Sequence, residues 1–309
     1  MLIKDLKHGE LVDSIYLVKD IAKNISSKGL NYLSVTLQDK SGTIECKKWT
    51  VEANDLVIAT PGSPVRILGT ADLRNDKMQI IISSIYAVSE ESVNFEDLLL
   101  ESPIPLKKLL EGFEKYKESI QNQDCKRILD NVFGKYYKKF IEYPAAVRNH
   151  HEFYHGLLYH SVSMCMVADF LAKHYSDIDR DLLITGCLLH DVGKVKEFSG
   201  PIATKYTTVG NLMGHLAIGA EIVNEAQIEL NITSEVPMLL KHMLLSHHGQ
   251  REYGAAVLPL TKEAQLLSMI DDMDSKMIMI DKSLKLTSPG EFGEKIYGLD
   301  GRSFYKPKD

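Results

Sequence analysis

The chain has 309 residues, of which 44% are hydrophobic and 25% charged, and its formal net charge is −6. These values are ordinary for a soluble globular protein and exclude a mostly disordered chain, a collagen-like chain and a small disulfide scaffold. No window reaches about 18 uninterrupted apolar residues, and the N-terminus lacks the apolar core of a signal peptide. We therefore expect a cytoplasmic protein of about two domains, with no membrane contact.

Cysteine usage and net charge narrow the class further. The four cysteines are far apart in the sequence and form no CxxC pair, so buried free thiols are favoured over disulfides or a thiolate metal site. The negative net charge means that any contact with nucleic acid has to be local.

The N-terminal region, residues 1–88, is predicted to be a β-domain. Apolar and polar residues alternate, Asp39-Lys40-Ser41-Gly42 is a hairpin turn signal, and residues 51–55 are expected to form one helical turn. Strands are expected at residues 32–37, 43–46, 65–71 and 78–88. Short strands with turns at this spacing are typical of a small closed barrel. This region carries 11 basic and 10 acidic side chains, a local net charge of +1.

The rest of the chain is predicted to be mainly α-helical. Residues 89–125 are expected to form a linker and a leading helix, residues 126–287 a helical domain and residues 288–309 a tail. Apolar residues recur at helical spacing from Pro105 onward. Helices are expected over 161–173, 179–190, 214–229, 237–247 and 261–281.

The histidines are unevenly distributed. Of 11 histidines, only His8 lies outside residues 150–248. Imidazole is the commonest metal ligand and an acid–base group near neutral pH, so this concentration marks the helical domain as the place to look for chemistry.

The most informative motif is Leu188-Leu189-His190-Asp191-Val192-Gly193-Lys194, at the end of an apolar helix. At a helix terminus His190 and Asp191 can turn toward one point, where the carboxylate can bridge two cations. Gly193 permits a tight backbone, and Lys194 adds a positive charge. Taken alone, the His-Asp pair is better explained as a capped helix end with a local hydrogen bond.

Further polar residues on otherwise core-facing helices favour a metal site over a capped helix end. They are His160, His215, His247, His248 and Asp271. Buried histidines and aspartates on consecutive helices are hard to satisfy pairwise without a metal ion. Nitrogen and oxygen ligands without cysteine suit Mn, Fe, Mg, Zn or Co.

The ordered set H…HD…H…H…D resembles the HD-domain metal-dependent phosphohydrolase superfamily. Within it, the segments GLLYHS, LLHDVGK, GHLAIGAEIV, LLSHHGQREYG and EAQLLSMIDDMDSK resemble the YhaM-type 3′→5′ exoribonucleases. Those proteins are similar in length and join an N-terminal OB-fold barrel to a C-terminal all-α HD domain. The resemblance covers nearly the whole chain and implies the same two-domain architecture here.

The resemblance also implies a ligand set for two divalent metal ions, with manganese as the first choice. His160, His190, Asp191 and Asp271 would bind one ion. Asp191 would bridge to a second ion, held by His215 and by His247, His248 or both. Asp274, one helical turn after Asp271, is a candidate acceptor that orients a ligand histidine.

Other histidines have two interpretations. His150, His151 and His155 precede the first ligand and are candidates for contact with substrate phosphate, although solvated surface positions explain them equally well. His174 and His242 are expected to be structural.

The predicted chemistry is hydrolysis by metal-activated water. Asp191 and Lys194 are the catalytic candidates: Asp191 bridges the ions, and Lys194 stabilises charge on the phosphoryl group. The alternative for Lys194 is a solvated lysine at a helix end.

The barrel is expected to bind a single strand. OB-folds combine a cationic groove with aromatic stacking platforms. The candidates are Tyr32, Lys47, Trp49 and Arg66; Lys48 is expected on the opposite face of its strand. Trp49 is equally well explained as an aromatic side chain that caps the core.

The resemblance therefore implies a 3′→5′ exoribonuclease that degrades single-stranded RNA, or single-stranded DNA, to nucleoside 5′-monophosphates. One alternative is a phosphohydrolase that acts on free or cyclic nucleotides, and another is a nucleic-acid-binding protein with little catalysis. The tail from Ser288 is expected to cover the site or to pack against another subunit of a homo-oligomer.

Overall fold

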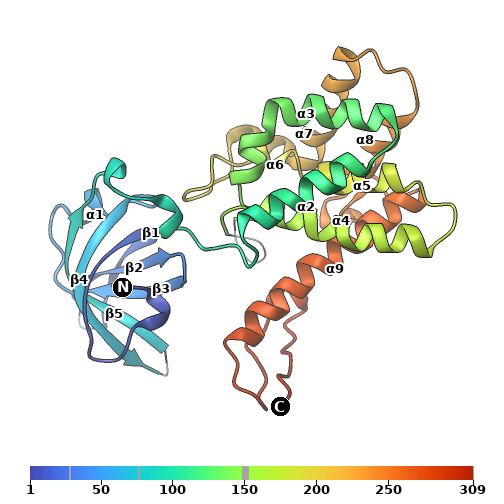
Figure 1. The fold of residues 1–309 in the computed structure, drawn as a ribbon. Helices are drawn as coiled ribbons and strands as arrows, with labels where there is room; N and C mark the ends of the chain where they lie inside the picture. The colour runs from blue at the N-terminus through green and yellow to red at the C-terminus, as the bar shows by residue number, and fades with distance from the viewer. Residues whose placement is uncertain (28, 76, 148–152, 309) are drawn as a thin grey trace. The chain divides into compact units, whose positions relative to one another are not determined.

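The computed structural model describes residues 1–27, 29–75, 77–147 and 153–308. The chain divides into two compact units, Met1–Glu101 and Ser102–Asp309. The first is a β-barrel and the second is helical (Figure 1). The expected order of a β-domain followed by an α-domain is confirmed.

The barrel is closed, with its strands in the order β1-β2-β3-β5-β4. The strands are β1 (Leu11–Ile25), β2 (Asn31–Asp39), β3 (Gly42–Lys48), β4 (Pro64–Arg74) and β5 (Lys77–Ala87). β1 is long enough to pair with β4 through its first half and with β2 through its second half, and its register shifts between Val18 and Asp20. This arrangement closes the five-stranded sheet, as in an OB-fold.

Apolar and polar residues alternate along these strands, so that the apolar side chains fill the interior of the barrel. Val35, Leu37, Cys46 and Ile80 are fully buried in this core. The predicted turn at residues 39–42 joins β2 to β3, and Asp39 and Gly42 face each other in the pairing. The single helical turn, α1 (Asp55–Ile58), begins where we expected that turn to end.

The first unit extends beyond residue 88. Residues 89–101, which we expected to belong to the linker, pack against the barrel. Leu98 and Leu99 are buried, the Leu98 carbonyl accepts a hydrogen bond from Gln38, and Asp97 pairs with Lys40 at 2.7 Å. Leu98 and Leu99 thus anchor the end of this acidic segment on β2 and on the turn that follows β2.

The second unit is built from eight helices among the described residues. They are α2 (Leu106–Ser119), α3 (Gln123–Glu142), α4 (Gly156–His174), α5 (Arg180–Leu189), α6 (Lys194–Glu197), α7 (Thr208–Glu229), α8 (Val236–Ser246) and α9 (Lys262–Lys285). α5 is the central helix, because nearly all of its residues are buried. The helices predicted by periodicity correspond to α4, α5, α7, α8 and α9.

α9 and the tail form the last part of the second unit. The first half of α9 packs on the helical core through Ala264, Leu267 and Ile270. Beyond it the chain turns back alongside α9, where Lys306 donates to the Thr287 carbonyl (Figure 1). No helix among the described residues combines the length and apolarity needed to cross a bilayer.

Candidate functional site

The His-Asp motif lies in a tight turn between α5 and α6. His190 follows the last residue of α5, and its ring Nδ1 donates to the Cys187 carbonyl at 3.0 Å. Gly193 lets this turn contact α7 directly: a methyl group there would overlap the carbonyl oxygen of His215 and lie 2.8 Å from the nitrogen of Gly219. The tight backbone that we expected at Gly193 is therefore confirmed, because only a residue without a side chain fits.

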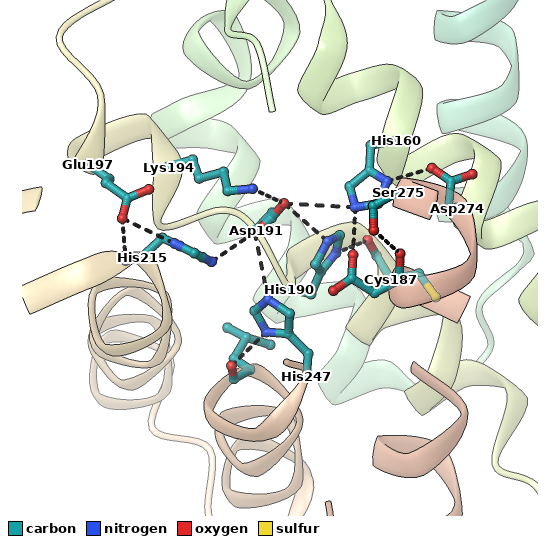
Figure 2. A network of polar contacts seen from close by, with 12 residues as sticks. His160, Cys187, His190, Asp191, Lys194, Glu197, His215, His247, Asp274 and Ser275 are labelled. Atoms are coloured by element: carbon teal, nitrogen blue, oxygen red, sulfur yellow. Dashed lines mark hydrogen bonds and ion pairs between the residues drawn. The ribbon is translucent and has the colours of Figure 1, made fainter. Parts of the chain in front are cut away.

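Asp191 is at the centre of the site, and its two carboxylate oxygens face different groups (Figure 2). Oδ2 lies 2.6 Å from Lys194 Nζ, 3.3 Å from His190 Nε2 and 3.9 Å from His160 Nε2. Oδ1 lies 3.3 Å from His215 Nε2 and 3.8 Å from His247 Nε2. A carboxylate in this position can bridge two cations.

His160 is held between two aspartates of α9. Its Nδ1 donates to Asp274 at 2.7 Å (Figure 2). Its Nε2 lies 3.0 Å from Asp271. Ser163, one turn further along α4, also donates to Asp274. The contact expected between Asp274 and a candidate ligand histidine is present.

His247 and His248 follow α8 and both face the site. The His247 ring lies 5.1 Å from that of His190, and the His248 ring lies 5.1 Å from that of His215, centroid to centroid. Each Nδ1 donates to a backbone carbonyl, that of Leu244 for His247 and that of Tyr253 for His248, at 2.8 Å in both cases. Both imidazoles therefore present Nε2 as the free ring nitrogen.

The centre contains polar atoms that are buried without a hydrogen-bond partner among the described residues. These are Nε2 of His190, His215 and His247, and Oδ1 of Asp191. Burial of unpaired polar atoms is costly, and each atom is a metal-ligating type. A bound cation satisfies all of them at once, so the residues present fit a metal centre.

The pKa values of three imidazoles in the centre are shifted in opposite directions by their surroundings. Burial, together with the neighbouring His190, holds the pKa of His247 well below its usual range, and burial also lowers the pKa of His248. Burial acts in the same direction on His160, but its hydrogen bonds to Asp271 and Asp274 outweigh that effect and raise its pKa to about 10. At neutral pH these shifts favour a neutral imidazole at His247 and at His248 and a protonated imidazole at His160.

The two aspartates remain ionised despite burial. Burial by itself would raise the pKa of Asp191, but the charges of Lys194 and His190 hold it well below its usual range. Burial by itself would also raise the pKa of Asp271, but the hydrogen bond from His160 and the charges of the neighbouring imidazoles together lower it. Both carboxylates therefore carry the negative charge that a cation site needs.

Two groups of side chains in the described part of the chain can each hold a metal ion. One is His160, His190 and Asp191, and the other is His215, His247 and His248. This division corresponds to the two ligand sets that we expected, with Asp191 between them. Asp271 joins the first group through its contact with His160.

Sequence reasoning missed one residue of the centre. Glu197, at the end of α6, accepts hydrogen bonds from the backbone nitrogen of His215 and from its Nδ1, at 3.0 and 3.1 Å. It is the only acidic residue between Asp191 and His215. A single acidic residue one helical turn after Lys194, between two candidate metal ligands, was the feature of the sequence that could have identified it.

The remaining histidines lie elsewhere. His155 precedes α4, and its Nδ1 donates to the Ile141 carbonyl, while His150 and His151 lie outside the described residues. His174 stacks on Phe170 and His242 accepts from the backbone of Leu260, so both have the structural contacts that we expected.

On the barrel, three of the four predicted strand-binding residues form one cluster. The rings of Tyr32 and Trp49 lie 4.9 Å apart, and Lys47 Nζ lies 5.2 Å from the Tyr32 ring centroid. Trp49 is 46% exposed, so it does not cap the core. Lys48 points inward, as its strand position predicts, and pairs with the buried Asp55.

Arg66 lies apart from this cluster. It pairs with Ile15 on β1, whereas Tyr32 pairs with Asn24, nine residues further along that strand. At about 3.3 Å per residue this is roughly 30 Å of strand. The Arg66 guanidinium also forms two hydrogen bonds with Asp13, at 2.6 and 2.7 Å. The structure does not bring Arg66 to the aromatic pair.

Comparison with known protein families finds a match in the helical unit. The HD domain family matches residues 157–276. The second OB-fold domain of replication protein A from Methanococcus maripaludis is 18% identical with a TM-score of 0.25, covering 30% of this chain and 98% of that domain. The strand order of the barrel, rather than this match, identifies its fold.

Curated relatives cover nearly the whole chain. The 3′-5′ exoribonuclease YhaM of Bacillus subtilis (strain 168) is 43% identical over 97% of this chain and 96% of that protein. The protein of the same name from Geobacillus sp. (strain WCH70) is 44% identical over 97% of this chain and 93% of that protein. With this identity across both units, the chain belongs to the YhaM family.

Proposed function

We propose that this protein is a metal-dependent 3′→5′ exoribonuclease that shortens single-stranded RNA to nucleoside 5′-monophosphates. The observation that carries the proposal is the geometry of Asp191, whose two oxygens each face a separate group of imidazoles. The relatives named as exoribonucleases support the choice of RNA.

The centre would hold two divalent ions. His160, His190, Asp191 and Asp271 would bind one ion, and His215, His247 and His248, with Asp191 as the bridge, the other. Both imidazoles of the His247-His248 pair are assigned as ligands, because both expose Nε2 toward the site. Manganese is our first choice, with Fe, Mg, Co and Zn as alternatives, since the donors are nitrogen and oxygen without thiolate.

Such ions supply Lewis acidity, which activates water for attack on a phosphodiester at neutral pH. The chain contributes the placement of charge around them. Lys194, only 11% exposed in its side chain, holds an ammonium beside the bridging carboxylate and is suited to stabilise charge on a phosphoryl oxygen. Its burial argues against a merely solvated lysine.

The barrel would hold the strand upstream of the reacting end. Tyr32 and Trp49 provide stacking faces, and Lys47 adds a cation beside them. A phosphohydrolase for free or cyclic nucleotides has no need of this platform, which favours a polymeric substrate. We place the protein in the cytoplasm, where its four buried free thiols stay reduced and RNA is available.

End-labelled single-stranded RNA incubated with the protein and Mn²⁺ tests the proposal. We expect processive or stepwise shortening from the 3′ end, with nucleoside 5′-monophosphates as products. Asp191→Asn is expected to abolish cleavage while strand binding by the barrel persists. The matched control is Asp272→Asn, because Asp272 is exposed and pairs with Lys276 on the surface of α9. Intact RNA after incubation with fully loaded protein would rule the proposal out.

A further inference from the structure

The five imidazoles of the centre are oriented in two different ways. His190, His247 and His248 each donate from Nδ1 to a backbone carbonyl. The other two, His160 and His215, donate to carboxylates, those of Asp274 and Glu197. These two histidines belong to different candidate metal groups, so each group contains one carboxylate-oriented imidazole.

Position relative to a helix end explains the difference for three of the five. His190 and His247 directly follow the last residues of α5 and α8, where backbone carbonyls lack an intrahelical partner and can accept from the ring. His215, in contrast, starts a new helical segment, because α7 breaks at Gly214 (φ 70°, ψ 156°). Backbone N–H groups, not carbonyls, are exposed at such a start, so the acceptor has to come from another element.

Glu197 supplies that acceptor, and its carboxylate has His215 as its hydrogen-bond partner. One oxygen, Oε1, accepts from both the backbone N–H and the ring Nδ1 of His215. The residue is 5% exposed, and among the described residues it forms no ion pair with a lysine or arginine. The two lysines of α6 are directed elsewhere, Lys194 to Asp191 and Lys196 to Glu225. The charge of Glu197 is therefore committed to His215.

The backbone of Glu197 is held as firmly as its side chain. Its carbonyl accepts from Thr207, and its nitrogen donates to the Gly193 carbonyl. Gly210 packs so closely that a methyl group on it would lie 2.9 Å from the Glu197 side chain. The carboxylate thus has little freedom to follow His215 and instead fixes its ring, with Nε2 3.3 Å from Asp191 Oδ1.

We propose that Glu197 is a positioning residue that keeps His215 in its metal-binding tautomer and thereby sets the affinity for the second divalent ion, as Asp274 does through His160 for the first. This inference rests on the proposed function, in which the centre binds two ions. Carboxylates that orient ligand histidines typically contribute about 10- to 100-fold to metal affinity.

Mn²⁺ binding to the full chain tests the proposal. Equilibrium dialysis and the electron paramagnetic resonance of bound Mn²⁺ are compared for wild type, Glu197→Gln, Glu197→Ala and Asp274→Asn. The control is Glu225→Gln. Glu225 pairs with Lys196 of the same short helix and contacts no imidazole among the described residues. We expect Glu197→Gln to weaken one of the two ions by about 10- to 100-fold, with a larger loss in Glu197→Ala. Asp274→Asn should weaken the other ion.

Several results would overturn the proposal. These are two ions bound as in wild type by Glu197→Ala, equal weakening of both ions by Glu197→Gln, or fewer than two ions bound by wild type. If the variants do not fold, the ¹⁵N imidazole spectrum of the metal-free wild type decides, because a His215 ring protonated on Nε2 contradicts the proposed role. Wild type that binds two ions yet leaves RNA intact refutes the proposed function while the role of Glu197 stands.

Discussion

The ammonium of Lys194 lies 2.6 Å from Oδ2 of Asp191, and both side chains are buried at the centre of the site. The contact joins residues three apart across the start of a short helix, so it forms within the motif itself. It places a fixed positive charge beside the carboxylate that we assign as the bridge. Lys194 therefore has two conceivable effects, on the charge of Asp191 and on the charge of a bound phosphate, and these can be separated.

Replacing Lys194 by Met keeps the length of the side chain and removes its charge. We expect kcat on single-stranded RNA to fall by about 100- to 1,000-fold, as for the loss of one donor to a developing oxyanion, with Mn²⁺ affinity changed much less. Single-turnover cleavage and Mn²⁺ dialysis measure the two effects. Lys196→Met, on the same helix but directed toward Glu225, is the control. An unchanged kcat in Lys194→Met would mean that the lysine only neutralises Asp191.

Metal binding is expected to stabilise the helical unit selectively. Among the described residues, the buried Nε2 atoms of His190, His215 and His247 have no hydrogen-bond partner. A ligand that binds only the folded state adds about 2.7 kcal/mol at 100 times its Kd. For a unit of this size, that corresponds to a rise in Tm of roughly 5–10 °C per site. Calorimetry with Mn²⁺ and then with a chelator measures the shift. A transition assigned to the barrel should not move, and an equal shift of both transitions would contradict a site confined to the helices.

Gly193→Ala is expected to damage the centre without touching a ligand. The added methyl would overlap the backbone of α7 at His215 and Gly219, so the turn and the helix have to separate. We expect a loss of about 1–3 kcal/mol in the free energy of unfolding, together with weaker binding of Mn²⁺. Gly134→Ala, on the exposed face of α3, is the control, because no atom of the described residues lies within 4 Å of its added carbon. Urea unfolding compares the two, and equal stabilities would show that α7 yields easily.

The aromatic pair on the barrel is expected to carry strand binding. Trp49→Ala and Tyr32→Ala should each weaken binding of single-stranded RNA by about 5- to 150-fold, since stacking contributes about 1–3 kcal/mol per base. Lys47→Met should reduce the salt dependence of binding. Fluorescence anisotropy with labelled RNA, in the Asp191→Asn background to prevent cleavage, provides the measurement.

Arg66→Ala is the matched control for that series. Arg66 is engaged by Asp13 and lies far along β1 from the aromatic pair, so its loss should leave RNA affinity within about twofold. A large effect of Arg66→Ala with none of Trp49→Ala would place the strand on the other side of the barrel.

The sequence by itself determined the elements and the candidate ligands. Alternation and turn residues predicted the barrel, helical spacing predicted α4, α5, α7, α8 and α9, and the His-Asp motif pointed to the centre. These features depend on residues close together in the chain. The contact of Asp274 with His160 was also predictable, because Asp274 lies one turn after Asp271 on the same helix.

Only the tertiary structure decided which partners the ligands have. Glu197 reaches His215, Arg66 lies away from Trp49, and residues 89–101 pack on the barrel. Each of these relations joins elements whose relative placement depends on how whole helices or strands pack. A change in crossing angle or register moves such side chains by several ångströms and leaves the local sequence pattern unchanged. The division of Asp191's oxygens between two groups of imidazoles is of this kind, since four helices have to meet before it exists.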